Sequence, residues 1–349
     1  MKLDDLLNHT SEWLKGSGPN SDIVISSRIR LARNLEKTPF PHWANKKQSE
    51  HSLAMIKEAA LKVDYLKKTT VFNMQELDTI DKQFLVERHL VSLEHIQKKD
   101  NNAVIIDDEE IVSIMVNEED HMRIQVMQSG FNIFEAWHII NLLDDGLAKE
   151  LTIAFLSDLG YLTACPTNTG TGMRASVMLH IPALVMTRQI NRVLAAISKL
   201  SFTTRGMYGE GTQATGNLFQ VSNQVSLGHT EAEIIDNING LIRQIIEQEN
   251  QARNALLSHS KAMLEDRINR SFGILKNARI ISSHETIELL SMVRLGSDLG
   301  IINELNNRHI NELFIIVQPA HLQKTEKNKL SSEERDIKRA EIIREKLKI

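Results

Sequence analysis

The spacing of hydrophobic and polar positions divides the first half of the chain into a helical part and a strand-rich part. Over residues 46–99 the apolar positions recur mostly with a helical period, ending in "DKQFLVERHLVSLEHI". Three short β-rich runs separated by acidic turns follow, namely "NAVIIDD", "EIVSIMVNEED" and "MRIQVMQ". This pattern predicts an antiparallel meander. Before the helical part, a short N-terminal helix and an extended segment, "SDIVISSRIRLARN", are expected.

The middle of the chain alternates helices and strands. Helices are expected over about residues 133–149 and 183–199, and the strand "RASVMLHIP" lies between them. A glycine-rich loop, "RGMYGEGTQATGN", precedes the strand-like stretch "LFQVSNQVSL". This interleaving predicts an α+β fold with a mainly antiparallel sheet flanked by helices.

Beyond residue 230 the pattern is helical throughout. "TEAEIIDNINGLIRQIIEQENQARNALL" predicts one long helix with Thr230 as its N-cap. The remainder predicts a helical bundle, so we expect an α+β domain over residues 1–255 and a helical domain over residues 256–349.

Composition and charge narrow the class of protein. The 349 residues are 42% hydrophobic and 25% charged, as in a globular protein. The net charge of −4 argues against direct nucleic-acid binding, which needs a strongly basic face. The single cysteine, Cys165, excludes an internal disulfide and a cysteine-based zinc site. We expect a cytoplasmic protein without a signal peptide or a membrane span.

Five arginines are predicted at strand starts or strand–loop junctions: Arg28, Arg30, Arg123, Arg174 and Arg205. Two of them, Arg28 and Arg30, are two residues apart and would share one face of an extended segment. The chain has no P-loop and no protein-kinase signature, so bound phosphates would need such side-chain cations. For any single arginine, an ordinary surface ion pair is the commoner alternative.

Candidate acid–base and nucleophilic groups lie in the loops. "NEEDH" carries Glu118, Glu119 and Asp120 directly after a strand, and Glu210 lies in "YGEG". A carboxylate there could ligate Mg²⁺ or accept a proton, although an acidic hairpin turn is the simpler explanation. Cys165 precedes a proline and is therefore expected in an extended conformation. Cationic neighbours would favour its thiolate, whereas most lone cysteines are small buried residues.

Long stretches of the chain resemble the ATP:guanido phosphotransferase (phosphagen kinase) family. They are "ISSRIRLARN", "LVERHL", "VNEEDHMRI", "CPTNTGTGMRASV" and "RGMYGEGTQATGNLFQVSN", in family order over roughly residues 21–230. The resemblance implies that Glu119 accepts a proton from a substrate guanidinium, Glu210 orients that group, and Cys165 lies against it as a thiolate. No residue of the chain is expected to ligate a metal directly.

The resemblance also implies an ATP site, with Mg²⁺ held mainly by the phosphates of ATP. Its residues would be Ser26, Ser27, Arg28, Ile29, Arg30, His89, Arg123, Arg174, Ala175, Ser176, Val177, Met178, Arg205, Gly206, Met207, Tyr208, Gly209 and Glu210. Among these, His89 is expected on a helix, between Arg88 and Leu90.

Two departures from the small-molecule members favour a large substrate. Those members carry a helical domain ahead of the catalytic domain, whereas "ISSR" begins here at residue 25. They also have GEHTE where this chain has "GEGTQ", so Gly211 and Gln213 replace a histidine and a glutamate. The chain is therefore most similar to the bacterial protein-arginine kinases of the family.

The C-terminal sequence "SSEERDIKRAEIIREKLKI" predicts a helix capped by Ser331 or Ser332. In this helix Arg335 and Arg339 stand four residues apart, where like charges repel unless an anion lies between them. The resemblance implies a phosphoarginine-binding motif over Arg335, Asp336, Ile337, Lys338, Arg339 and Ala340. The two arginines would take the phosphate and the aspartate the guanidinium. A solvated helix is the alternative.

The expected function is transfer of the ATP γ-phosphoryl group to arginine side chains of proteins, a mark for the Clp protease in the stress response. The resemblance implies further partners, which are a zinc-binding activator protein, a heat-shock repressor that the kinase inactivates, and a second copy in a homodimer. Phosphoarginine binding could be allosteric or only a docking device. Two alternatives are a phosphagen kinase acting on free arginine or another guanidino compound, and an inactive phosphoarginine-binding adaptor.

Overall fold

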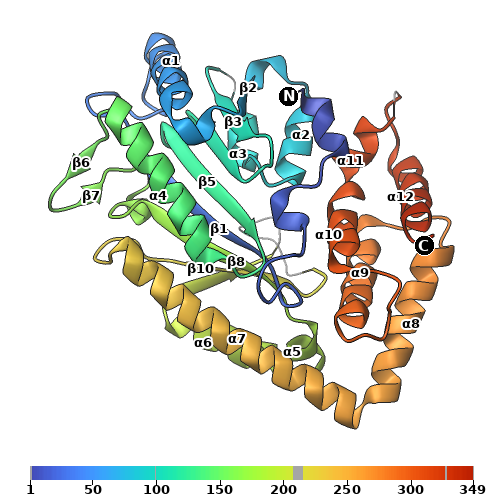
Figure 1. The fold of residues 1–349 in the computed structure, drawn as a ribbon. Coiled ribbons are helices and arrows are strands. Elements are labelled where there is room, and N and C mark those ends of the chain that lie inside the picture. The colour runs from blue at the N-terminus through green and yellow to red at the C-terminus, as the bar shows by residue number, and fades with distance from the viewer. Residues whose placement is uncertain (1, 99, 207–214, 327, 349) are drawn as a thin grey trace.

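The structure is a computed structural model that describes residues 2–98, 100–206, 215–326 and 328–348. Eight strands of these residues form one antiparallel sheet in the order β2-β3-β4-β5-β1-β8-β10-β9 (Figure 1). Their bounds are β1 Val24–Arg33, β2 Thr69–Asn73, β3 Ala103–Asp107, β4 Val112–Val116, β5 Met122–Ser129, β8 Met173–His180, β9 Phe202–Arg205 and β10 Leu218–Asn223. The predicted α+β class and the β3–β4–β5 meander are confirmed.

The long strand β1 forms the centre of the sheet, paired with β5 on one side and β8 on the other. Side chains of a strand point alternately to the two faces. Ile29 and Leu31 enter the main hydrophobic core, whereas Arg28 and Arg30, which alternate with them, face the other way. The sheet therefore has one apolar face and one face rich in cations.

Three long helices cover the apolar face: α1 Lys46–Lys62, α4 Ile133–Glu150 and α7 Glu231–His259 (Figure 1). Two shorter helices, α5 Pro182–Met186 and α6 Ile190–Lys199, follow β8 in the chain. On the other face, α2 Thr79–Glu87 packs a second core against β3 and β4, and α3 Leu93–Gln97 follows it. A separate hairpin, β6 Phe155–Leu156 with β7 Gly160–Tyr161, projects beyond the end of α4 (Figure 1).

The chain after α7 is helical, as predicted. Its elements are α8 Lys261–Asn277, α9 Ser283–Asp298, α10 Asn307–Ile316, α11 Pro319–Lys324 and α12 Ser332–Lys346. The predicted caps are present: Thr230 caps α7 and Ser331 caps α12, each in a reciprocal capping box with the glutamate three residues on. α7 itself runs through residue 255. None of the helices among the described residues is long and apolar enough to cross a bilayer.

Residues 46–99 are mostly helical, as predicted, although they also contain the edge strand β2. Two other local predictions were wrong. The helix expected over 183–199 is two helices, because Arg188 between them has a φ of 59°, which ends α5 and redirects the chain. In place of the expected N-terminal helix there are two short 3₁₀ helices, η1 Leu3–Asn8 and η2 Glu12–Leu14. Further 3₁₀ helices are η3 Asp64–Leu66, η4 Met74–Glu76 and η5 Pro166–Asn168.

Candidate functional site

The five arginines singled out in the sequence come together on the cationic face of the sheet. Arg30 on β1 lies opposite Arg174 on β8, and Arg123 on β5 lies opposite Ala32 of β1. Arg205, at the end of β9, is close enough to lower the pKa of Arg28. Residues far apart in the sequence therefore form one cluster across five neighbouring strands.

The crowding of these cations affects their titration. Burial and the charges of Arg123, Arg174 and Arg205 lower the pKa of Arg28 to about 9. Burial and the neighbouring arginines also lower the pKa of Arg30 far below its ordinary value. An anion between these groups would relieve the repulsion, so a polyphosphate fits the donor set.

Neutral side chains complete this face. Arg28 donates through Nε to Oγ of Ser176 at 3.4 Å and through Nη2 to Oε1 of Gln220 at 2.8 Å. By contrast, Ile29, Ala175 and Val177 lie in the hydrophobic core.

The remaining residues of the predicted ATP site fall in three groups. Ser26 on β1 and Met178 on β8 are buried, and Ser27 donates its hydroxyl to the carbonyl of Gly130 at 2.9 Å. Gly206 follows β9 directly and is buried. The predictions for Met207, Tyr208, Gly209 and Glu210 lie outside the described residues.

The acidic turn between β4 and β5 holds two glutamates with opposite properties. Glu118 is buried and accepts two hydrogen bonds from Nη1 of Arg123, at 2.7 and 2.8 Å. Burial opposes its ionisation, but Arg123 and the hydroxyl of Ser92 outweigh this and hold the pKa of Glu118 at about 2. Glu119 is exposed, and partial desolvation with the charges of Asp120 and Glu118 raises its pKa. Glu119 is thus the better proton acceptor.

Asp120 connects this turn to the cysteine loop. One carboxylate oxygen, Oδ1, accepts from the backbone N–H of Ala164 at 2.7 Å and from Nδ2 of Asn34 at 2.6 Å. Glu119 precedes Asp120 and Cys165 follows Ala164. The hydrogen bond between Asp120 and Ala164 therefore brings the segments of these two catalytic candidates together. This bridging role of Asp120 could not be predicted, because its position in an acidic stretch of sequence carries no signal of a tertiary partner.

Cys165 has the extended backbone that its following proline predicted, with φ −95° and ψ 120°. It is partly exposed, and its Sγ lies 3.0 Å from the hydroxyl of Thr167. The alternative of a buried structural thiol is therefore wrong. The thiol is displayed on the loop that leads into β8.

His89 is not on a helix, which corrects the prediction. α2 ends at Glu87, and His89 adopts a left-handed turn with φ 60°. Its carbonyl accepts from Nε2 of Gln125 at 2.8 Å, and the ring of Trp13 packs edge-on at 5.3 Å. Burial and the charge of Arg28 lower the pKa of His89 to about 3, so its ring lies near the arginine cluster and is neutral at physiological pH.

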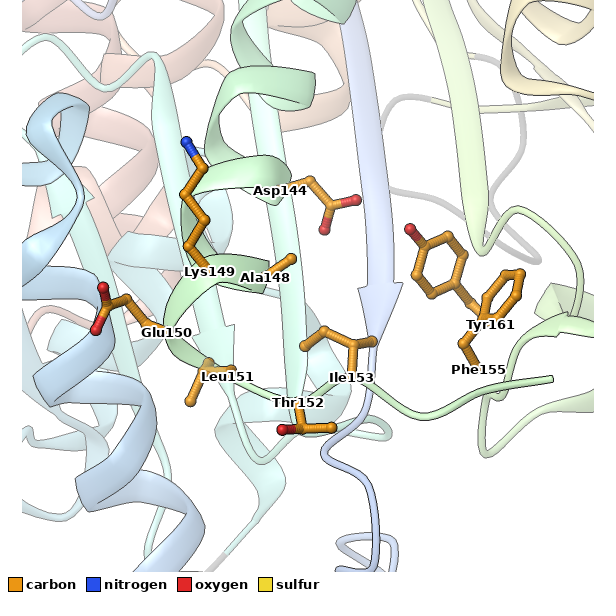
Figure 2. A pocket seen from close by; sticks show the side chains of 9 residues that line it. All are labelled: Asp144, Ala148, Lys149, Glu150, Leu151, Thr152, Ile153, Phe155 and Tyr161. Carbon is orange, nitrogen blue, oxygen red and sulfur yellow. The ribbon is translucent and has the colours of Figure 1, made fainter. Parts of the chain in front are cut away.

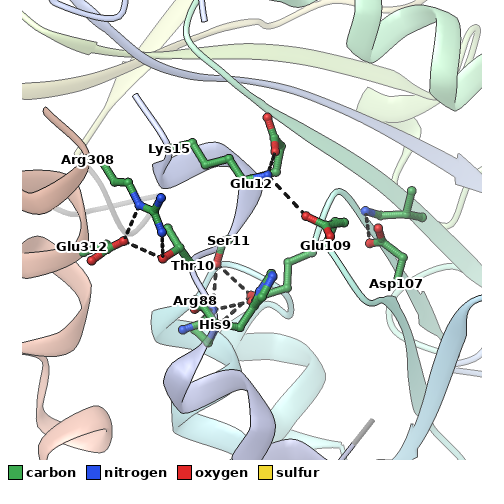
Figure 3. Close-up of polar contacts among 12 residues, drawn as sticks. His9, Thr10, Ser11, Glu12, Lys15, Arg88, Asp107, Glu109, Arg308 and Glu312 are labelled. Carbon is green, nitrogen blue, oxygen red and sulfur yellow. Dashed lines mark hydrogen bonds and ion pairs between the residues drawn. The ribbon is translucent and has the colours of Figure 1, made fainter. Parts of the chain in front are cut away.

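A polar network around Arg88, the residue before His89, reaches the N-terminal segment and α10 (Figure 3). Arg88 is buried and donates to Glu110, to the hydroxyl of Ser11 at 2.9 Å and to the carbonyl of His9 at 3.0 Å. Thr10 then donates to Glu312 of α10 at 2.5 Å. This network fixes the residue that precedes His89.

Glu87, two residues before His89, contacts the C-terminal helices directly. Its carboxylate accepts from the backbone N–H groups of Ala320 and His321, at 2.8 and 3.0 Å, and from Nδ1 of His321 at 2.8 Å. It therefore caps the N-terminus of α11. The turn that carries His89 is thus anchored by the two residues before it, Glu87 and Arg88.

The motif "RDIKRA" lies on α12 as predicted, but its two arginines differ. Arg339 is buried; its Nε donates to the carbonyl of Val317 and its Nη1 to the carbonyl of Ile281, both at 2.9 Å, and it forms an ion pair with Asp336. Arg335 is half-buried and donates to the carbonyl of Leu330 at 3.0 Å.

The other members of the motif also differ from one another in their surroundings. Ile337 is 45% exposed and Ala340 is buried. Lys338 forms ion pairs with Glu326 and Glu341 at 3.0 and 3.2 Å. Within the described residues, no group of three or more His, Cys, Asp or Glu side chains is arranged to hold a metal ion.

Comparison with known proteins assigns the class. The catalytic-domain model of the ATP:guanido phosphotransferases (their C-terminal catalytic domain) matches residues 52–252. The chain therefore belongs to the ATP:guanido phosphotransferase family. Residues 261–349 match a second model, the protein-arginine kinase McsB C-terminal domain.

Individual relatives narrow the assignment within the family. The protein-arginine kinase of Halothermothrix orenii is 49% identical over 99% of this chain and 99% of its own length. That of Brevibacillus brevis is 50% identical over 98% of this chain and 96% of its own. Among solved structures, the duplicated taurocyamine kinase of Schistosoma mansoni with bound transition-state-analogue components matches with a TM-score of 0.62 at 26% identity, covering 72% of this chain and 35% of that one.

Proposed function

We propose that this enzyme is a protein-arginine kinase, which transfers the γ-phosphoryl group of ATP to arginine side chains of other proteins. The full-length relatives with this name support the substrate class. The hydrogen bond from Ala164 to Asp120 is the single observation that carries the mechanism, because it joins the segments of Glu119 and Cys165 beside the arginine cluster.

In this mechanism Glu119 takes a proton from the substrate guanidinium. A guanidinium is otherwise protonated at all physiological pH values and is a poor nucleophile. The neutral nitrogen then attacks the γ-phosphorus, an N–P bond forms, and the bond to the ADP oxygen breaks. The raised pKa of Glu119 supports this role, since a base works best when its pKa approaches the working pH.

The arginine cluster would hold the triphosphate and neutralise charge on the transferring group. Positioning and electrostatic stabilisation supply most of the catalysis in phosphoryl transfer. Mg²⁺ would enter with ATP, held by the phosphates. Cys165 would lie against the substrate guanidinium as a thiolate, and Glu210 would orient it from the other side.

The wider role follows from the same family. The proposal includes a zinc-binding activator, delivery of phosphorylated proteins to a Clp protease, inactivation of a heat-shock repressor, a homodimer formed by the C-terminal helices and a cytoplasmic location. It also includes phosphoarginine binding by residues 335–340. The match of residues 261–349 to the C-terminal domain supports these partners.

The test is labelling with γ-³²P-ATP of a denatured test protein and, separately, of free arginine. We expect acid-labile label on the protein, with phosphoarginine identified by mass spectrometry under non-acidic handling. Label on free arginine alone would reject the protein substrate. Glu119→Gln should lower kcat by at least about 10²-fold, whereas Glu50→Gln, an exposed glutamate on α1, should not. A fully active Glu119→Gln enzyme would remove the proposed base.

A further inference from the structure

The β6–β7 hairpin exposes three large apolar side chains next to the cysteine loop. Phe155 is 55% exposed, Leu156 is 50% exposed and Leu159 is 44% exposed. Single exposed apolar residues are common, but a group on one small hairpin forms a patch. Of the three, Phe155 also lines a concave surface between this hairpin and the end of α4.

That surface is a groove of about 490 Å³ between the last turn of α4 and the hairpin. Figure 2 shows Asp144 and Ala148 on one side and Tyr161 with Phe155 on the other. The two rings pack edge to face at 5.2 Å. Ile153 lines the same groove.

Two of the three charged side chains that line the groove, Asp144 and Glu150, are paired with cations. Asp144 accepts a bidentate pair of hydrogen bonds from the buried Arg33, with the shortest at 2.7 Å. Glu150 forms an ion pair with Lys62 at 3.1 Å. Apart from these two carboxylates, Lys149 and Thr152, the groove is lined by aromatic and aliphatic side chains.

The aromatic wall is held rigidly. The guanidinium carbon of Arg33 lies 3.4 Å from the centre of the Tyr161 ring. The same guanidinium donates to the carbonyls of Ala32 and Thr171 at 2.9 Å. A wall fixed in this way loses little conformational entropy when a ligand binds.

Tyr161 joins one wall of the groove to the catalytic loop. Tyr161 donates its backbone N–H to the carbonyl of Gly170 at 2.8 Å, which closes the loop that carries Cys165. Asn34 donates both to the carbonyl of Leu162 and to Asp120. Cys165 is the fourth residue after Tyr161, a span of at most ~14 Å for extended chain.

We infer that this groove binds an apolar side chain of the substrate polypeptide, about four residues from the arginine that is phosphorylated. An extended substrate covers the distance from thiol to groove in about four residues. Apolar side chains are free to enter such a groove mainly in unfolded segments, because folded proteins bury most of them. This inference rests on the proposed function and adds a preference for unfolded segments with an apolar residue near the arginine.

The experiment uses the full-length kinase, ATP and three peptides with one arginine each. Two carry leucine four residues before or four residues after the arginine, and the third has serine at both positions. We expect one leucine peptide to have a KM about tenfold below that of the serine peptide, the ratio expected from burying one apolar side chain. Phe155→Ser should remove this difference without changing kcat or the KM for ATP, and Phe155→Leu should restore it.

A matched control is Phe134→Ser, because Phe134 is 51% exposed and lies about 15 Å from Asp144 along the same helix. It should leave all KM values unchanged. Equal KM values for the three peptides with the wild-type enzyme would overturn the inference while leaving the kinase activity established. A change in mass by light scattering in Phe155→Ser, with the peptide preference unchanged, would assign the groove to self-association and also overturn it. If neither these peptides nor a denatured protein gains phosphoarginine, the proposed function fails and the inference fails with it.

Discussion

Arg30 on β1 and Arg339 on α12 are both shielded guanidinium groups, and their surroundings are opposite. The neighbours of Arg30 that affect its titration most are other arginines, and burial together with these charges lowers its pKa. Arg339 is surrounded by acceptors, namely two backbone carbonyls and the carboxylate of Asp336. The first environment destabilises a cation and the second satisfies one.

The difference separates two uses of arginine. Gathering like charges costs free energy that only an anion can recover, so a cluster of this kind is expected where a polyphosphate binds. A buried arginine that donates to carbonyls of two other segments instead holds those segments together. Substitutions in the sheet face should therefore change activity, and substitution of Arg339 should change stability.

The largest expected effect is that of Arg30→Ala on catalysis. We expect kcat/KM to fall about 10²–10³-fold, the usual loss when one preorganised donor to the developing charge is removed. The melting temperature should stay within a few degrees of the wild type, because the substitution also relieves repulsion from Arg28 and Arg174. Arg30→Lys serves as the control that keeps the charge but loses the bidentate geometry. An active Arg30→Ala enzyme with a lowered melting temperature would reverse the comparison.

The next largest effect is that of Arg339→Ala on stability. Its removal leaves the carbonyls of Val317 and Ile281 without this donor and Asp336 without its cation, and we expect about 3 kcal/mol lower free energy of unfolding. Urea unfolding measures this loss as a lower midpoint. Arg267→Ala, at an exposed position of α8, is the control and should change stability by less than about 0.5 kcal/mol. A stable Arg339→Ala protein would show that the contacts of Arg339 do not support the fold.

The sequence alone predicts which arginines lie on the cationic face of the sheet, but it does not predict the contacts of the motif on α12. Alternation along "SSRIRL" determines which residues face the core, and Arg28 and Arg30 follow that rule. The long helix α7 and its Thr230 cap could also be predicted, because both depend on local signals. Arg339 donates to the carbonyls of Ile281 and Val317, which are far from it in the sequence, and no local sequence pattern predicts such tertiary partners.

The same distinction explains the other outcomes in the site. The extended backbone of Cys165 follows from the next residue being proline, so it could be predicted. The left-handed turn at His89 could not, because it depends on α2 ending at Glu87 and on tertiary contacts with Trp13 and Gln125. Helical period alone would have continued α2 through this position.

A third prediction concerns how the arginine cluster on the sheet responds to pH. The pKa of Arg28 is about 9, so this group loses its proton, and its affinity for phosphate, as the pH rises through that value. We expect kcat/KM for ATP to fall above about pH 9, by up to tenfold per pH unit. Bound triphosphate favours the charged form, so the corresponding fall in kcat should occur at higher pH. In Arg28→Gln, kcat/KM for ATP should be lower and should not change with pH in this range. A fall in kcat/KM that persists in this variant would come from the titration of another group.

The smallest expected effect is that of Arg335→Ala, and it decides whether the α12 motif is a ligand site at all. Arg335 is half-buried and donates to a single carbonyl, that of Leu330, so its loss should change the free energy of unfolding by less than about 1 kcal/mol. If residues 335–340 bind phosphoarginine, the same substitution should weaken binding of phosphoarginine severalfold, as expected for one partly solvated contact between a guanidinium and a phosphate. Calorimetric titration with phosphoarginine measures the affinity, and free arginine is the control ligand. Unchanged affinity in Arg335→Ala would show that Arg335 does not bind phosphoarginine. The other arginine of the motif, Arg339, already donates to backbone carbonyls of the fold, so the motif would then not be a phosphoarginine site.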